Sequence, residues 1–186
     1  KPLTPYALNK ASAESMYLYY YNVYQIPCVL FRIANPYGPR CQMIHSKYAI
    51  INWFIKQAIE NEKITIFGDG NQKRDYIFVE DLVEGMIKAS IQKKCIGEVF
   101  NIGSGVAVGF KTMVETVIDV VGTGDINNIE WPIEYINVET GDYVADISKL
   151  THSIDWKPTH SLEAGIQKTV EYYRKYRKYY WKDNLK

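Results

Sequence analysis

CVLFRIAN, residues 28–35, decides the fold class of this chain. It is a short, continuous run of apolar, β-type residues, the pattern of a parallel strand that is buried on both faces. Helix signals precede it from Thr4 to about Tyr24: a polar cap, then a proline at a position that the first turn tolerates. The turn-forming stretch NPYGPR, residues 35–40, follows it. A helix, a buried strand and a loop in this order are typical of an α/β fold.

The same alternation continues beyond residue 40. In the helix expected at 79–90, Asp81, Val83 and Met86 give a polar entry and an apolar face. Strands that alternate with helices imply parallel pairing, so the fold class is α/β. We expect a strand that enters a glycine turn within 63–70, a short extended piece at 76–79, and a strand and turn within 97–105. We expect helices at 46–60, 79–90, 111–121 and from 161 onward, a helical turn within 146–158, and a looser segment at 122–140.

Composition limits the possible functions. The 186 residues are 47% hydrophobic, which suits one globular domain with a real core, and a net charge of +1 gives no field that favours nucleic acid or an anionic membrane. Three widely spaced cysteines without a C-x-x-C pair indicate a reducing, cytoplasmic setting and no zinc site. The three histidines share no metal-binding spacing, and we expect each to be a solvated loop residue. No run of 18 apolar residues and no signal peptide is found.

Tyr6 and Lys10 are the first candidate catalytic residues. They lie four positions apart near the start of the first expected helix, so they share one face. A phenol titrates near pH ~10, and a neighbouring ammonium favours its ionised form. Such a tyrosine can exchange a proton with a sugar or alcohol hydroxyl. Since this spacing is common in helices, a plain surface pair is the alternative.

Six motifs in a fixed order support the chemical interpretation. Together they resemble the extended short-chain dehydrogenase/reductase family, and within it the NAD-dependent nucleotide-sugar epimerases and dehydratases. The resemblance extends from Tyr6 to about Tyr173. The motifs are YALNK (6–10), FRIANPYGPR (31–40), IFGDGNQKRDYIFVEDL (66–82), FNIGSG (100–105), GDYVADISKL (141–150) and DWKPTHSLEAGI (155–166).

The resemblance implies a specific architecture. Residues 1–40 would be the last part of a Rossmann-type, doubly wound NAD-binding domain. Residues 41–186 would be mainly a small α/β substrate-binding domain, with about 76–103 returning to the Rossmann domain. The family's glycine-rich turn and first strands are not in this sequence, so we expect a C-terminal fragment of an enzyme, itself of uncertain activity. Family members commonly dimerise through a bundle that includes the tyrosine helix, which implies a homodimer.

The resemblance also assigns the cofactor side of the site. Tyr6 would be the active-site base, and Lys10 would hold it ionised and hydrogen-bond the nicotinamide ribose. Ile33 and Pro36 would lie beside the cofactor, which is NAD. NAD carries the redox chemistry, and the protein contributes position and electrostatics.

On the substrate side, the resemblance points to five residues. Asn35 would contact substrate phosphate, although an asparagine before proline is also a common turn former. Thr65 would contribute backbone contacts and Phe67 would pack on the nucleotide base, although a strand phenylalanine is usually core. Arg74 has the guanidinium geometry that suits a diphosphate, with an ion pair to Asp75 or Asp81 as the alternative. Asp142 would accept hydrogen bonds from the nucleotide ribose.

The sequence departs from the family at Glu139. The family usually reads R-x-G-D at this point, with the arginine on the diphosphate, whereas this chain reads ETGD. A carboxylate repels a diphosphate, so either the loop is displaced or the phosphate is held elsewhere. Lys47, near the start of an expected helix, is a candidate for the missing charge. The departure leaves the nucleotide open among UDP, dTDP, CDP and GDP.

Three functional readings follow. We favour a fragment of a nucleotide-sugar epimerase, in which C4 of the sugar is oxidised and then reduced on the other face. A 4,6-dehydratase, in which the C4 ketone permits loss of water from C5 and C6, is the second reading. A non-catalytic module that binds a nucleotide-sugar or a protein partner is the third. The identity of the sugar stays open in all three.

Two further motifs have structural interpretations. GSGVAVG, residues 103–109, has the spacing G-x-G-x-x-x-G and no acidic residue about 20 positions on, so we read it as a tight turn and not a dinucleotide loop. The basic, aromatic tail at 172–186 could bind nucleic acid or a membrane. We prefer a helix end whose apolar face packs and whose cations suit the helix dipole. Ser161 caps that helix, and its expected inward residues are Leu162, Ile166, Thr169, Val170 and Tyr173.

Overall fold

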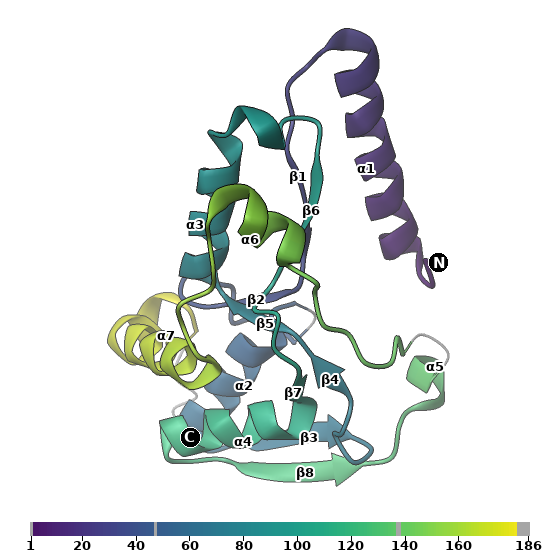
Figure 1. Ribbon diagram of the computed structural model, residues 1–186. Helices are drawn as coiled ribbons and strands as arrows, with labels where there is room; N and C mark the ends of the chain where they lie inside the picture. Colours follow the sequence, from purple (N-terminus) through teal and green to yellow (C-terminus); the bar gives the residue numbers. More distant parts are fainter. Residues whose placement is uncertain (1, 47, 137–138, 182–186) are drawn as a thin grey trace.

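The computed structural model describes residues 2–46, 48–136 and 139–181, and these form two layers (Figure 1). The upper layer contains helices α1 (Pro5–Tyr24), α3 (Val79–Ser90) and α6 (Ser148–Ile154) around strands β1 (Leu30–Ile33) and β6 (Val99–Ile102). The lower layer contains helices α2 (Ile50–Ile59), α4 (Phe110–Val121) and α7 (Leu162–Tyr176) with strands β3 (Lys63–Phe67) and β8 (Asp125–Ile129). Strands β2 (Asn35–Tyr37) and β5 (Tyr76–Phe78) lie between the layers.

The strand pairing confirms the α/β fold class. β1 runs parallel to β6, β2 to β5 and β3 to β8, while the short β4 (Lys73–Arg74) and β7 (Val108–Gly109) pair antiparallel. The helical pieces α5 (Ile133–Ile136), η1 (Lys93–Cys95) and η2 (Arg177–Tyr179) complete the described elements. The expected strand at 28–35 is present over its middle part, as β1, and the first three residues of NPYGPR form strand β2 and not a turn.

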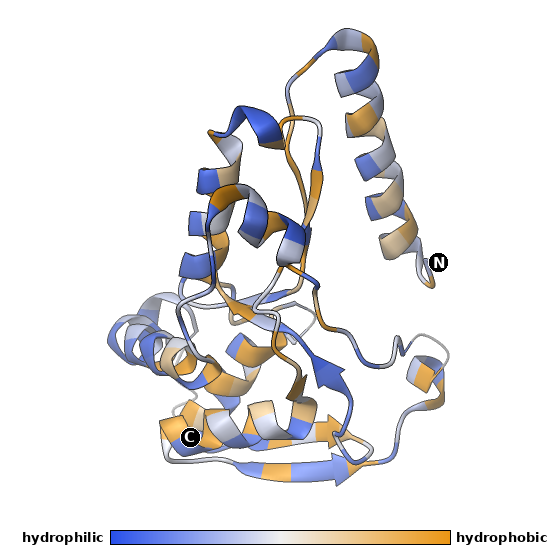
Figure 2. Ribbon diagram, viewed as in Figure 1, coloured by the Kyte–Doolittle hydropathy of each residue, from blue (hydrophilic) through white to orange (hydrophobic). Residues whose placement is uncertain are grey.

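Two hydrophobic clusters form the core. The upper one packs Leu82 of α3, Phe100 of β6, Leu150 of α6 and Trp156 together. The lower one packs buried residues of α2, α4 and α7 against β3, and the ribbon of these helices carries many hydrophobic positions (Figure 2). All five residues expected to face inward on α7 are buried or half-buried, and the Ser161 side chain caps that helix by accepting from Ala164 N.

A buried asparagine joins the stretch 35–40 to the lower layer. The Asn52 Nδ2 group donates to the Gly38 carbonyl at 2.6 Å and to the Tyr173 hydroxyl at 3.1 Å, and its Oδ1 accepts from Gly38 N. Buried polar groups need hydrogen-bond partners. The Asn52 side chain supplies them for the backbone N–H and carbonyl of Gly38. Asn52 lies on α2, which begins at Ile50 and not near residue 46 as expected.

Two sequence expectations for this part of the chain are wrong in detail. The looser segment expected at 122–140 contains strand β8, which pairs only with β3 and leaves most of its residues exposed, so it has no apolar run to reveal it. On α3, the buried face is formed by Leu82, Gly85 and Ala89, whereas Val83 is 46% exposed. The small residues Gly85 and Ala89, beside Leu82, allow α3 to approach strand β6 closely.

Helix α1 confirms its expected bounds but packs little. Thr4 caps it by accepting from Ala7 N, and none of its side chains is buried. Its ties to the upper layer include an ion pair between Glu14 and Arg32, and contact of the Tyr21 ring with Gly97, where no Cβ would fit. Apolar and polar residues alternate along its exposed surface (Figure 2).

Gly85 provides a test of the packing of α3. An added Cβ would lie 2.9 Å from both Ile102 Cδ1 and a ring carbon of Trp156. Alanine favours a helix over glycine by about 1 kcal/mol, but overpacking costs typically about 1–3 kcal/mol. We therefore expect Gly85→Ala to lower the free energy of unfolding by about 1 kcal/mol in urea denaturation. The control Ser90→Ala, on the exposed side of α3, should change it by less than about 0.5 kcal/mol, and a stabilised Gly85→Ala variant would contradict the packing.

Candidate functional site

The candidate site begins where β1 and β2 meet β5 and β6. Asn35 opens strand β2, next to Tyr76 in the register with β5. Its backbone N–H and its side-chain Nδ2 both donate to the carbonyl of Asp75, each at 3.0 Å. Its side chain is therefore fixed by the backbone of the neighbouring strand. In open α/β sheets, ligands bind outside the carboxyl ends of strands, the place that Asn35 occupies after β1.

Asp75 is the buried charge at the centre of this region. Its side chain is fully buried and accepts four hydrogen bonds: from Ser104 N at 2.7 Å, Ser104 Oγ at 2.6 Å, Gly105 N at 3.0 Å and Ala145 N at 3.1 Å. A Cβ at Gly103 would collide with this carboxylate. The turn at 103–105 thus already holds an anion of the chain itself, in agreement with its interpretation as a structural turn. The sequence alone suggested Asp75 only as a possible ion-pair partner of Arg74.

Arg74 points away from Asp75. Its Nη2 forms an ion pair with Glu139, and its Nη1 donates to the carbonyls of Lys73 and Gly141. The alternative that paired Arg74 with Asp75 or Asp81 is therefore wrong. Both partners of the observed pair are partly buried, with side chains 17% and 28% exposed. Arg74 ends strand β4, and these bonds fix the direction of its guanidinium toward residues 139–141.

Asp142 lies next to β4, directly after Gly141, whose carbonyl accepts from Arg74. Its Oδ1 accepts from Lys73 N at 2.8 Å, and Tyr143 N donates to the Lys73 carbonyl at 3.0 Å. The stretch 139–143 thus runs alongside β4 and is held by backbone hydrogen bonds. The second Asp142 oxygen is not engaged in these bonds, and the residue is exposed.

Phe67 ends strand β3 within an aromatic cluster. Its ring stacks on Tyr135 of α5, with 5.6 Å between the ring centroids and 25° between the planes. The Trp131 ring lies 5.5 Å away at a tilt. Phe67 is half-buried and Thr65, two residues earlier on the strand, is exposed. The stretch that follows β8 therefore provides partners both for Phe67 and for Arg74.

The cofactor-side residues lie on exposed surfaces. Tyr6 and Lys10 share one face of α1 as expected, with the Lys10 Nζ 5.5 Å from the centre of the Tyr6 ring, and Tyr6 is 67% exposed. Ile33 is 43% exposed at the end of β1, and Pro36 is exposed. Lys47, the candidate for the missing phosphate-binding charge, lies outside the described residues.

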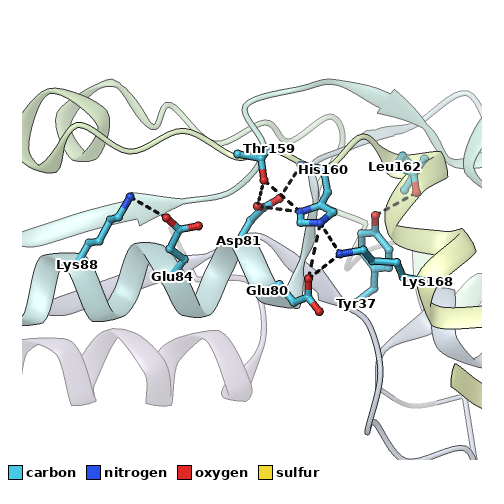
Figure 3. A network of polar contacts seen from close by, with 9 residues as sticks. All are labelled: Tyr37, Glu80, Asp81, Glu84, Lys88, Thr159, His160, Leu162 and Lys168. Carbon is cyan, nitrogen blue, oxygen red and sulfur yellow. Dashed lines mark hydrogen bonds and ion pairs between the residues drawn. The ribbon is translucent and has the colours of Figure 1, made fainter.

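A second polar network joins α3 to the loop before α7 (Figure 3). The buried Asp81 carboxylate accepts from Thr159 Oγ1 at 2.8 Å, from His160 N at 3.0 Å, and contacts His160 Nδ1 at 3.0 Å. On its other side, the His160 ring meets Lys168 Nζ at 2.9 Å. Among the described residues His160 is thus a packed, bonded residue, and the expectation of a solvated loop residue is wrong for it.

The hydrogen bonds determine the charge state of Asp81. Burial raises the pKa of its carboxyl, but hydrogen bonds from His160 and Thr159 outweigh burial and leave the pKa below its usual value. The carboxylate is therefore the favoured form in the folded state. None of the expected site residues that the structure describes takes part in this network, which secures α7 to α3.

The described part of the chain also has a groove away from the expected site residues. This groove, between α3 and residues 39–40, is lined by Val79, Val83, Ile87 and Tyr172, and it contains none of the expected site residues. Within the described ranges, no cluster of three or more His, Cys, Asp or Glu side chains could hold a metal ion. No helix in these ranges is both long enough and apolar enough to cross a membrane.

Asp81→Asn tests the second network through pH. Because folding lowers the Asp81 pKa, its contribution to stability is complete above the unfolded pKa of about 3.9 and is lost as pH falls through the folded pKa. We expect Asp81→Asn to lower the free energy of unfolding by about 1–3 kcal/mol at pH 7, since it disrupts buried hydrogen bonds to a charged group.

The difference in free energy of unfolding between Asp81→Asn and the unmodified chain should become smaller as pH falls below about 4. Urea denaturation at several pH values measures it. The exposed Asp119 on α4 is a matched control, and Asp119→Asn should show almost no gap at any pH. A gap for Asp81→Asn that is constant from pH 7 to pH 3 would contradict the assignment.

Comparison with known proteins places these residues in context. A model of the NAD dependent epimerase/dehydratase family matches residues 1–103. The UDP-glucose 4-epimerase of Mycolicibacterium smegmatis is 31% identical over 176 residues, which are 93% of this chain and 54% of that protein. The dTDP-D-glucose 4,6-dehydratase of Mus musculus is 32% identical over 179 residues, 94% of this chain and 49% of that protein.

A solved structure agrees with these sequence matches. The UDP-glucuronic acid 4-epimerase of Bacillus cereus, in complex with UDP-glucuronic acid and NAD, superposes with a TM-score of 0.82 at 31% identity. The match covers 95% of this chain and 54% of that one. The chain spans about half the length of the curated relatives that it matches.

Proposed function

Because the chain belongs to the NAD-dependent epimerase/dehydratase family, we propose that it forms part of an enzyme that converts a nucleotide-sugar with NAD as the cofactor. The favoured reaction is 4-epimerisation, with 4,6-dehydration as the alternative, since relatives of both kinds match at nearly equal identity. One observation carries the proposal. A stacking ring, Phe67, and a fixed guanidinium, Arg74, contact the same short stretch of chain, at Tyr135 and Glu139.

The substrate-binding roles follow from the chemistry of each side chain. A nucleotide has a flat base and a charged diphosphate, which suit an aromatic face and a guanidinium respectively. We assign the base to Phe67 and the backbone at Thr65, the diphosphate to Arg74, and the ribose to the Oδ2 oxygen of the exposed Asp142. Asn35, held by the Asp75 carbonyl, would donate to substrate phosphate only by exchanging that bond.

The cofactor-side residues fit NAD in their chemistry. Lys10 has three ammonium donors for ribose hydroxyls, and the exposed Ile33 and Pro36 offer apolar surface to a nicotinamide ring. When bound, NAD supplies hydride acceptance and return. Tyr6 would take the proton from the sugar C4 hydroxyl, and the Lys10 ammonium lies on the same face of α1, 5.5 Å from the centre of the Tyr6 ring.

Assembly and location are part of the proposal. We infer a homodimer in which α1 takes part, because all the apolar side chains of this 20-residue helix are at least partly exposed. The described cysteines, Cys28, Cys41 and Cys95, are all free thiols, which suits the reducing cytoplasm. A module that binds nucleotide-sugars without redox chemistry is the competing function, and it would retain the Arg74 and Phe67 roles without those of Tyr6 and Lys10.

Arg74→Lys tests the substrate site. Lysine keeps the charge but cannot present two parallel N–H donors, so we expect UDP-glucose to bind the 186-residue chain roughly tenfold more weakly, measured by calorimetry. The control Arg32→Lys changes an exposed arginine on β1 that pairs with Glu14, and it should leave the affinity unchanged. Equal affinities for all three proteins, or no binding by any of them, would refute the assignment of Arg74.

Tyr6→Phe separates the enzyme from the binding module. Removing the phenol oxygen removes the proposed base, so we expect the rate of UDP-glucose conversion to UDP-galactose to fall by about 10²–10⁴-fold in the protein that contains this chain. The affinity for UDP-glucose should not change. Tyr17→Phe, on the same helix and 61% exposed, is the matched control and should keep full activity. Undiminished turnover in Tyr6→Phe would exclude Tyr6 as the base.

A further inference from the structure

The groups assigned to the nucleotide already have partners within the chain. Residues 131–136 and 139–142, which we name the covering segment, contact both of them. Tyr135 stacks on the Phe67 ring in a near-parallel arrangement, at an interplanar angle of 25°. Trp131 lies beside the same ring, and its indole is so close to Gly68 that an added Cβ there would come within 2.5 Å of it. An aromatic side chain therefore takes the position expected of a base.

Glu139 takes the position expected of a phosphate. Its Oε1 accepts from Arg74 Nη2 and also from Gly141 N at 3.1 Å. Both side chains of the ion pair are less than a third exposed, so the pair is screened less than an exposed surface pair. The Arg74 Nη1 is bonded to main-chain carbonyls in addition. A phosphate could reach the Nη2 donor only if the Glu139 carboxylate moved away.

The two contacts imitate the order of groups in a nucleotide. An aromatic ring and a carboxylate, four residues apart on the covering segment, meet an aromatic ring and a guanidinium, just as a base and a diphosphate would. Each contact by itself is an ordinary one. Both contacts come from one short segment. A nucleoside diphosphate that bound to Phe67 and Arg74 would have to displace both Tyr135 and Glu139.

We propose that Glu139 is an affinity-determining residue, which competes with the substrate diphosphate for Arg74 from within the chain. The inference rests on the proposed function, because it takes Arg74 as the diphosphate site. A competing intramolecular contact reduces the apparent affinity by the fraction of molecules in which the site is free. Glu139 therefore weakens the binding of ligands that carry phosphate and has no effect on ligands that lack it.

The test compares Glu139→Gln with Glu134→Gln by calorimetry on the 186-residue chain. Glutamine keeps the size of the side chain and removes the charge. Glu134 lies on the same segment, next to Tyr135, is exposed, and makes no ion pair among those found between described residues. The ligands are UDP, which has the diphosphate, and uridine, which has only base and ribose. Circular dichroism melting verifies that each variant is folded.

We expect Glu139→Gln to bind UDP roughly tenfold more tightly than the unmodified chain and to bind uridine equally well. Glu134→Gln should match the unmodified chain with both ligands. The gain for UDP should shrink at high salt, since it arises from charge.

Three results would overturn the inference. If Glu139→Gln binds UDP no more tightly than the unmodified chain, Glu139 does not compete, while the proposed function stands as long as Arg74→Lys weakens binding. If Glu134→Gln gives the same gain, the effect is one of net charge and not of the Arg74 contact. If UDP binds to none of the proteins, both the inference and the proposed function fail.

Discussion

The carboxylate of Asp75 is the constraint on which the site depends. It has no cationic side chain as partner in the bonds described and is stabilised instead by four hydrogen-bond donors from two separate stretches, at 104–105 and at 145. A buried charge is tolerated only with such complete hydrogen bonding. Its main-chain carbonyl also fixes Asn35. One residue thus ties together the end of β1, the start of β5, the end of β6 and the stretch that follows Asp142.

The two sides of the proposed site differ in how many contacts hold them. Arg74 directly precedes Asp75 in the chain, so the hydrogen bonds of Asp75 also fix the backbone position from which the Arg74 side chain extends. Helix α1, in contrast, buries no side chain and is held through Glu14, Tyr21 and few other contacts. The proposed base, Tyr6, therefore lies on an exposed helix surface, whereas Phe67 and Arg74 are held by contacts with Tyr135 and Glu139.

The Glu139 departure changes meaning once the structure is known. From the sequence, a carboxylate at this point looked like a loss of phosphate-binding charge, to be replaced by another cation. In the structure it is a partner of Arg74, the residue expected to bind the phosphate. The ion pair joins residues 65 positions apart, and local sequence patterns carry no information on such a contact.

The sequence by itself determined the fold class, the bounds of α1 and α3 and the inward face of α7, and it named candidate site residues whose roles stay predictions. These depend on periodicity, capping and ordered motifs, which are local. It could not reveal β8, which has polar residues because it lies at an edge, or the face of α3, where small residues and not large ones meet the strand. Only the tertiary structure decided that Asp75 organises the site, that His160 is bonded to Asp81 and that Glu139 meets Arg74. These are contacts between distant residues, and their energies depend on burial and geometry that exist only in the folded chain.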